Sequence, residues 1–148
     1  MGADIHLVVL TQEPSGTWKL FPRTVENPDI WGEHGSPGSW YNGRNYILFG
    51  ALAGVRSSIV EPIAACRGPL QEACLQGVDI GDHSFTWMTL REVIQYDWMQ
   101  EIETYYGNME PLGQSCENFL NAITVLWDTT QELGLTPDQV KLVMGFDS

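Results

Sequence analysis

Apolar residues form a continuous run near the start of the chain and another near its end. Residues 4–10 begin with polar positions and close on four consecutive apolar residues, which is typical of a central strand in a sheet. A Pro-Gly turn at residues 13–16 follows, so residues 17–21 are predicted to return as the second arm of a hairpin. Residues 140–146 form the second apolar run. We expect this last strand to pair beside the first.

Two short helices are predicted in the first half of the chain. Residues 45–54 are apolar on all sides and contain several Gly and Ala residues, which predicts a buried helix that its neighbours approach closely. Residues 69–76 give a weaker helical pattern. Residues 22–43 are rich in Pro, Gly and Asn and are expected to form a long loop, as are residues 55–68.

Two further helices are predicted in the second half. Thr89 and Glu92 have the spacing of a capping box, which predicts a helix that starts after Thr89. The apolar face expected for it carries Leu90, Val93, Ile94 and Trp98. The longest helix is predicted over residues 115–133 and ends before Gly134. Its apolar stripe consists of Phe119, Ile123, Leu126, Trp127 and Thr130.

This order of elements predicts an α+β fold. A small, mainly antiparallel sheet, made of the N-terminal hairpin and the C-terminal strand, would be packed by the helices. A chain of 148 residues is most simply one domain over residues 1–148, and no change of composition marks a boundary within it.

The net charge of the chain limits the classes of partner that it is expected to bind. The net charge is −12 and the isoelectric point is about 4.3, which argues against duplex nucleic acid and anionic membrane surfaces as partners. No apolar run has membrane-spanning length, and the N-terminus lacks the basic region of a signal peptide, so we expect a cytoplasmic protein. The three cysteines show no metal-binding spacing and are expected to be reduced thiols. The oligomeric state stays open, a homo-oligomer included.

Candidate chemistry starts with two histidines and an aspartate. Asp4 and His6 are two residues apart on a predicted strand and therefore point to the same face. His83 lies in the predicted turn at residues 81–84, a good position for a group that faces a cleft. Two imidazoles and a carboxylate suit a divalent metal, direct contacts to a ligand, or structural hydrogen bonds. The sequence does not choose among these three.

A second cluster surrounds the start of the first helix. Arg44 stands near a helix N-terminus, where free N–H groups attract anions, and its planar guanidinium suits phosphate or carboxylate. Arg56 follows the same helix, and Tyr41 and Tyr46 offer rings for stacking. Together they predict a pocket for an anion attached to a ring, as in a nucleotide. The structural alternative is that Arg44 pairs with an acid.

Asn42 and Asn45 belong to the same cluster. Each is a candidate ligand contact, and each is equally suited to a turn or to a helix cap. No serine-nucleophile motif, P-loop or dinucleotide fingerprint accompanies them.

Three blocks of sequence stand out together. They are Met-Gly-Ala-Asp-Ile-His at residues 1–6, Tyr-Asn-Gly-Arg-Asn-Tyr-Ile-Leu-Phe at residues 41–49, and Gly-Asp-His-Ser at residues 81–84, followed by Trp87. With the Val55-Arg56 pair, these blocks resemble a family of small proteins found in phage and prophage genomes. Members commonly have Cys in place of Ala3 and Asp in place of Asn42. The resemblance implies a viral origin and shared site residues, but no particular chemistry.

These observations support three hypotheses of function. In the first, a phage accessory protein binds and sequesters a small nucleotide-like anionic ligand, such as an immune signal of the host, without a cofactor. Its ligand contacts would be Asp4, His6, Tyr41, Asn42, Arg44, Asn45, Tyr46, Arg56 and His83. In this hypothesis Asp4, His6, Arg44 and His83 converge in one cleft.

The other two hypotheses come from different classes of protein. A metal-dependent phosphodiesterase or nucleotide hydrolase would hold a divalent metal with Asp4, His6 and His83 and would activate water on it. An acidic inhibitor, for example a DNA mimic, would instead bind a host protein. The spread of the acids along the chain disfavours the inhibitor slightly. Whether the protein is an enzyme is therefore left open by the sequence.

Overall fold

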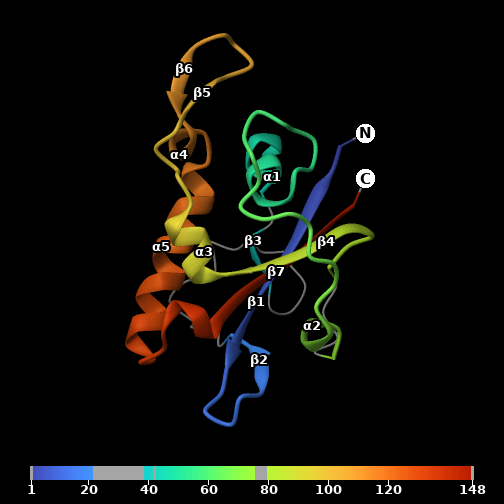
Figure 1. The fold of residues 1–148 in the computed structure, drawn as a ribbon, viewed down its shortest axis with the longest axis vertical. Helices are drawn as coiled ribbons and strands as arrows, with labels where there is room; N and C mark the ends of the chain where they lie inside the picture. The colour runs from blue at the N-terminus through green and yellow to red at the C-terminus, as the bar shows by residue number, and fades with distance from the viewer. Residues whose placement is uncertain (1, 22–38, 42, 76–79, 148) are drawn as a thin grey trace.

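The computed structural model describes residues 2–21, 39–41, 43–75 and 80–147, and these form an α+β fold (Figure 1). The described strands of the main sheet run in the order β2-β1-β7-β4, and β3 also pairs with β1. These strands are β1 (Asp4–Gln12), β2 (Trp18–Leu20), β3 (Ser39–Tyr41), β4 (His83–Thr89) and β7 (Val140–Asp147). Every pairing among them is antiparallel, which confirms the predicted sheet type.

The first and last strands form the centre of the sheet, as predicted. Asp4 lies opposite Asp147 and Leu10 lies opposite Lys141, so β1 and β7 pair along almost their whole length. Alternate residues face opposite sides. Ile5, Leu7 and Val9 of β1 belong to the larger hydrophobic core, whereas Val8 and Leu10 belong to a smaller one.

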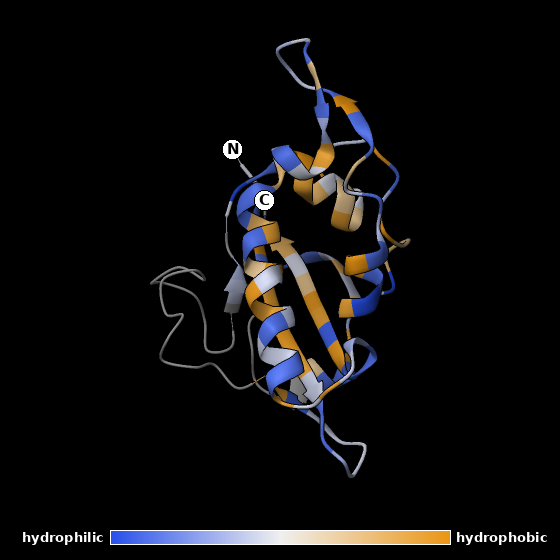
Figure 2. Cartoon of the chain, turned by 90° about the vertical axis from the view of Figure 1, so that its left-hand side faces the viewer, coloured by the Kyte–Doolittle hydropathy of each residue, from blue (hydrophilic) through white to orange (hydrophobic). Residues whose placement is uncertain are grey.

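Helices cover both faces of the sheet. The larger core is covered by α1 (Tyr46–Ala53), α3 (Leu90–Gln95) and α5 (Glu117–Glu132), and the smaller one by α2 (Gln71–Leu75). Figure 2 shows the mainly hydrophobic strands behind α5. As predicted, α1 is buried from Leu48 to Ala53. A methyl group on Gly50 would lie 2.7 Å from the Ser57 carbonyl oxygen, which explains the small residue there.

The predicted capping box is present at the start of α3. The Thr89 hydroxyl accepts the Glu92 N–H at 3.2 Å, and the Glu92 carboxylate accepts the Thr89 N–H at 3.0 Å. The apolar face predicted for this helix was partly wrong, because Ile94 is 42% exposed. The helix ends at Gln95, so Ile94 lies in its last turn and Trp98 lies beyond it.

Two strands after α3 were not predicted. β5 (Glu101–Glu103) and β6 (Met109–Pro111) form a separate hairpin that projects beyond the main sheet (Figure 1). Each has three residues, too few for an alternating pattern to be recognised. The chain continues through α4 (Leu112–Ser115) into α5, and the 3₁₀ helix η1 (Pro137–Gln139) precedes β7. None of the described helices has the length and apolar character needed to cross a membrane.

Candidate functional site

The residues before α1 position its first turn. The Asn45 side chain accepts the Leu48 N–H at 3.1 Å and so caps the helix. Its amide nitrogen donates to the Ser115 carbonyl at 2.7 Å, which ties α1 to the end of α4. The oxygen and the nitrogen of the Asn45 amide therefore both form hydrogen bonds within the fold. The structure therefore supports the prediction that Asn45 caps the helix.

Tyr46, the first residue of α1, lies between the N-terminus and Arg56. Its hydroxyl accepts the Ala3 N–H at 3.1 Å. The Arg56 guanidinium carbon lies 5.6 Å from the centre of the Tyr46 ring. A methyl group on Gly2 would meet both the Arg44 guanidinium carbon, at 2.6 Å, and the Tyr46 hydroxyl, at 2.8 Å. Arg44 and Arg56 thus both lie next to Tyr46, and we call Arg44, Tyr46 and Arg56 the Tyr46 site.

Arg44 also forms an ion pair with Asp4. Its Nε and Nη2 donate to the Asp4 Oδ1 at 3.0 and 2.7 Å, and this hydrogen bonding raises the pKa of Arg44. The side chains of Arg44 and Asp4 are 53% and 55% exposed. The alternative predicted for Arg44, pairing with an acid, is confirmed. The exposure also leaves its guanidinium within reach of a ligand.

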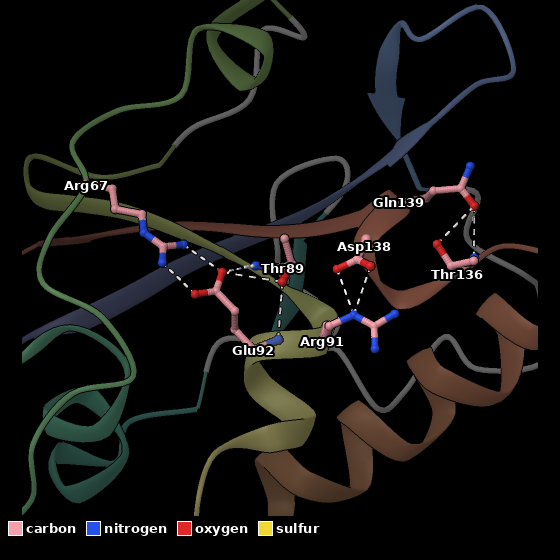
Figure 3. A network of polar contacts seen from close by, with 7 residues as sticks. All are labelled: Arg67, Thr89, Arg91, Glu92, Thr136, Asp138 and Gln139. Atoms are coloured by element: carbon pink, nitrogen blue, oxygen red, sulfur yellow. Dashed lines mark hydrogen bonds and ion pairs between the residues drawn. The ribbon is translucent and has the colours of Figure 1, made fainter.

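The other cations in the described ranges contact partners elsewhere. Their contacts are Lys19 with Glu13, Arg67 with Glu92, Arg91 with Asp138, and Lys141 with the rings of Trp18 and Trp87. Figure 3 shows the pairs of Arg67 and Arg91 around the start of α3. Within the described part of the chain, two cations also meet at the Trp87 ring, where Arg67 and Lys141 lie 4.7 and 4.8 Å from the ring centre, but Arg67 is held there by Glu92.

Backbone strain marks two positions in this part of the fold. Arg56 has φ +64° and Ser84 has φ +56°, and they are the only described residues other than glycine in the left-handed region. Such conformations cost about 1–3 kcal/mol each and are concentrated at functional sites. Arg56 belongs to the Tyr46 site, and Ser84 follows His83, whose Nδ1 lies 2.9 Å from the Ser84 hydroxyl oxygen.

The two histidines lie on opposite faces of the sheet. His6 is paired in register with Gly145, whereas His83 is paired with Phe146. Because paired residues share a face and successive residues alternate, His6 and His83 point to different sides. The prediction that Asp4, His6, Arg44 and His83 converge in one cleft is therefore wrong. Gly145 and Phe146 are successive residues of β7 and face opposite sides of the sheet, so the two histidines that pair with them do so as well.

His83 is nevertheless connected to the Tyr46 site through a row of rings. The ring centres of Tyr46 and Phe49 are 5.7 Å apart, those of Phe49 and Phe146 are 5.1 Å apart, and those of Phe146 and His83 are 6.5 Å apart. On the other face, His6 Nε2 contacts the Asp147 carboxylate. Sequence reasoning missed Asp147. The predicted pairing of the first and last strands is the signal that could have found it, because an antiparallel pair brings the end of the last strand beside the start of the first.

The described side chains form no metal site. No group of three or more His, Cys, Asp or Glu within the described ranges is placed to hold a metal ion, and Asp4, His6 and His83 all lie in those ranges. Asp4 and His6 lie on one face of the sheet, and His83 lies on the other. The three-residue metal site considered from the sequence is therefore not assembled.

Tyr41 belongs to the core and does not act as a stacking surface. It is 8% exposed and packs edge-on against Phe119, with the ring centres 5.4 Å apart. Burial raises the pKa of its hydroxyl. The structure thus disfavours the prediction that Tyr41 stacks on a ligand, because β3 pairs with β1 and turns this ring toward α5. Asn42 lies outside the described residues.

Comparisons with known proteins provide no relative. No protein-family model matches the chain, and searches of curated proteins and of solved structures found no match.

Proposed function

We propose that the protein binds and sequesters a small nucleotide-like anionic ligand at the Tyr46 site. One observation carries the proposal: Arg44 and Arg56 both lie next to Tyr46, in a chain that has only seven Lys and Arg residues and a net charge of −12. An acidic protein attracts an anion where its few cations gather, and at the other such place in the described ranges, the Trp87 ring, the arginine is already held by Glu92. The left-handed backbone of Arg56 supports the same site.

Each side chain has a role that fits its chemistry. Arg44 would exchange the exposed Asp4 carboxylate for a phosphate, which accepts two parallel hydrogen bonds from a guanidinium. Arg56 would neutralise a second negative charge. The Tyr46 ring would stack on a base. His83 is separated from Tyr46 by the rings of Phe49 and Phe146, which are fully buried, so it is given no ligand contact in this proposal.

The resemblance to phage proteins extends this proposal. A viral protein that holds such a ligand without converting it would lower the free concentration of a signalling nucleotide in the host cytoplasm. The hydrolase hypothesis used Asp4, His6 and His83 together, and these side chains do not share one face. We therefore propose sequestration, and turnover becomes the outcome that the experiment must distinguish from it.

The test is calorimetric titration with a panel of cyclic and linear mono- and dinucleotides. We expect stoichiometric binding of at least one member and its recovery intact. Arg44→Ala and Arg56→Ala should weaken binding, whereas the control Arg91→Ala, which removes an exposed arginine paired with Asp138, should not. Failure of the whole panel to bind would refute the proposal. Multiple-turnover product formation that EDTA stops would replace it with the hydrolase.

A further inference from the structure

The hairpin of β5 and β6, with the residues that lead into it, exposes large apolar side chains. We call residues 97–111 the hairpin arm. Met99, Tyr105, Tyr106 and Met109 are 77%, 69%, 95% and 61% exposed. These four are more exposed than any other large apolar side chain in the described ranges. Apolar residues concentrated on one projecting element indicate an interaction surface.

The tip of the arm is a well-formed turn. The Thr104 N–H donates to the Asn108 carbonyl at 2.8 Å, and the Gly107 N–H donates to the Thr104 carbonyl at 2.9 Å. Gly107 has φ +87°, which the turn requires and which glycine adopts without strain. The two central positions of such turns usually hold small polar residues. Here they hold Tyr105 and Tyr106, which are therefore presented on a fixed backbone.

The base of the arm is anchored in the core. Ile102 is 3% exposed and Leu112, directly after the arm, is fully buried. The Leu112 N–H donates to the Gln100 carbonyl at 2.8 Å, which closes the hairpin at its base. An arm that is held by these hydrogen bonds and by buried residues at its base loses little conformational freedom when it binds, which favours affinity.

The charge around the arm identifies the kind of partner. Residues 92–140 contain no Lys, Arg or His, whereas the arm itself carries Asp97, Glu101, Glu103 and Glu110. This local charge opposes contact with nucleic acid or anionic lipid. It also opposes contact with a second copy of a chain whose net charge is −12. A surface with Lys and Arg is complementary to it.

We infer that the hairpin arm docks, Tyr105 and Tyr106 first, into an apolar groove rimmed by Lys and Arg on another protein. Tyrosines are frequent among the residues that dominate binding energy at protein interfaces, where they fill apolar pockets. The acids of the arm would lie at the rim, where opposite charges set orientation and association rate. This interaction surface shares no residue with the Tyr46 site and does not depend on the proposed ligand.

Site-specific photo-crosslinking tests the inference. The full-length protein, with the photoreactive residue p-benzoylphenylalanine in place of Tyr106, is irradiated in cells that carry its gene. A matched control carries the same residue in place of Leu133, which is 48% exposed on another part of the surface. The protein that crosslinks from position 106 and not from position 133 is identified by mass spectrometry. It is then purified and titrated against the unmodified chain.

Support requires three results together. The crosslinked residues lie beside Lys or Arg, the double variant Tyr105→Ser/Tyr106→Ser binds at least about tenfold more weakly than Leu133→Ser, and added salt weakens binding. Both tyrosines are exposed, so the double variant should keep the melting temperature of the parent. A crosslink to a second copy, to nucleic acid or to lipid overturns the inference. So does the absence of a crosslink specific to position 106, or binding that neither the variant nor salt changes.

Discussion

Two arginine–carboxylate pairs in this protein have the same chemistry and different surroundings. Arg67 donates to both oxygens of Glu92, at 2.7 and 2.5 Å, and its guanidinium carbon lies 4.7 Å from the centre of the Trp87 ring. The side chains of Arg67 and Glu92 are 29% and 31% exposed. Arg44, in contrast, reaches a single oxygen of Asp4, and both of those side chains are more than half exposed.

The difference shows which arginine is able to change partners. Glu92 also closes the capping box of α3, so its carboxylate accepts from Arg67 and from the Thr89 N–H (Figure 3). These contacts, the Arg67 hydrogen bond above all, lower the pKa of Glu92 to about 2. Release of Arg67 would disturb a helix start, whereas release of Arg44 would disturb one exposed pair. Arg67 therefore stabilises the fold, and Arg44 is the one available to a ligand.

The largest effect should come from Arg44→Ala on ligand binding. If Arg44 donates charge-assisted hydrogen bonds to a phosphate, its removal should weaken nucleotide binding roughly ten- to hundredfold, measured by calorimetric titration. Arg44→Lys should restore only part of the affinity, because an ammonium lacks the planar fork. Full affinity in Arg44→Ala would place the ligand elsewhere.

Glu92→Ala should cause the next largest effect, on stability. The change removes the capping carboxylate and leaves Arg67 without its partner, so we expect the free energy of unfolding to fall by about 2 kcal/mol. Glu92→Gln should be milder, because an amide can still close the capping box. Chemical denaturation measures both variants. Equal stability of Glu92→Ala and the parent would mean that the two pairs do not differ as we argue.

The order of elements could be predicted from the sequence because it depends on local patterns. The apolar runs of the central strands and the spacing of Thr89 and Glu92 indicate strands and a helix start without knowledge of the rest of the chain. The β5–β6 hairpin could not be predicted, since its register depends on a turn with tyrosines at its centre. β3 was missed for a similar reason, because pairing with β1 makes it a strand.

The candidate site was predicted less well, because it depends on register and on which neighbour each side chain meets. Tyr41 and Tyr46 are the same type of residue in the same short segment, but Tyr41 packs against Phe119 in the core and Tyr46 lies next to Arg56. His83 could not be assigned to a face before its pairing with Phe146 was known. Types of residue suggest chemistry, whereas the side of a strand decides whether two groups meet.

Acid should weaken the Arg67–Glu92 pair over a defined range of pH. The folded-state pKa of Glu92, about 2, lies below its ordinary value of 4.5, so its contribution to stability is complete above pH 4.5. That contribution is lost as the pH falls toward 2. After allowance for solvent screening we expect the loss to be about 1–2 kcal/mol. Unfolding of the parent and of Glu92→Gln across this range should show the extra acid sensitivity in the parent alone.

The smallest effect should come from Asp4→Asn, and it separates a fold-stabilising role of the Arg44 pair from a ligand-binding one. Exposed pairs contribute little to stability, so the melting temperature should stay within about 2 °C of the parent. The amide competes less well than a carboxylate for the guanidinium and carries no charge that repels an anion. Nucleotide binding should therefore become a few-fold tighter, in the direction opposite to Arg44→Ala. If Asp4→Asn instead lowers the melting temperature markedly and leaves binding unchanged, the Arg44–Asp4 pair stabilises the fold as Arg67–Glu92 does, and the contrast between the two pairs disappears.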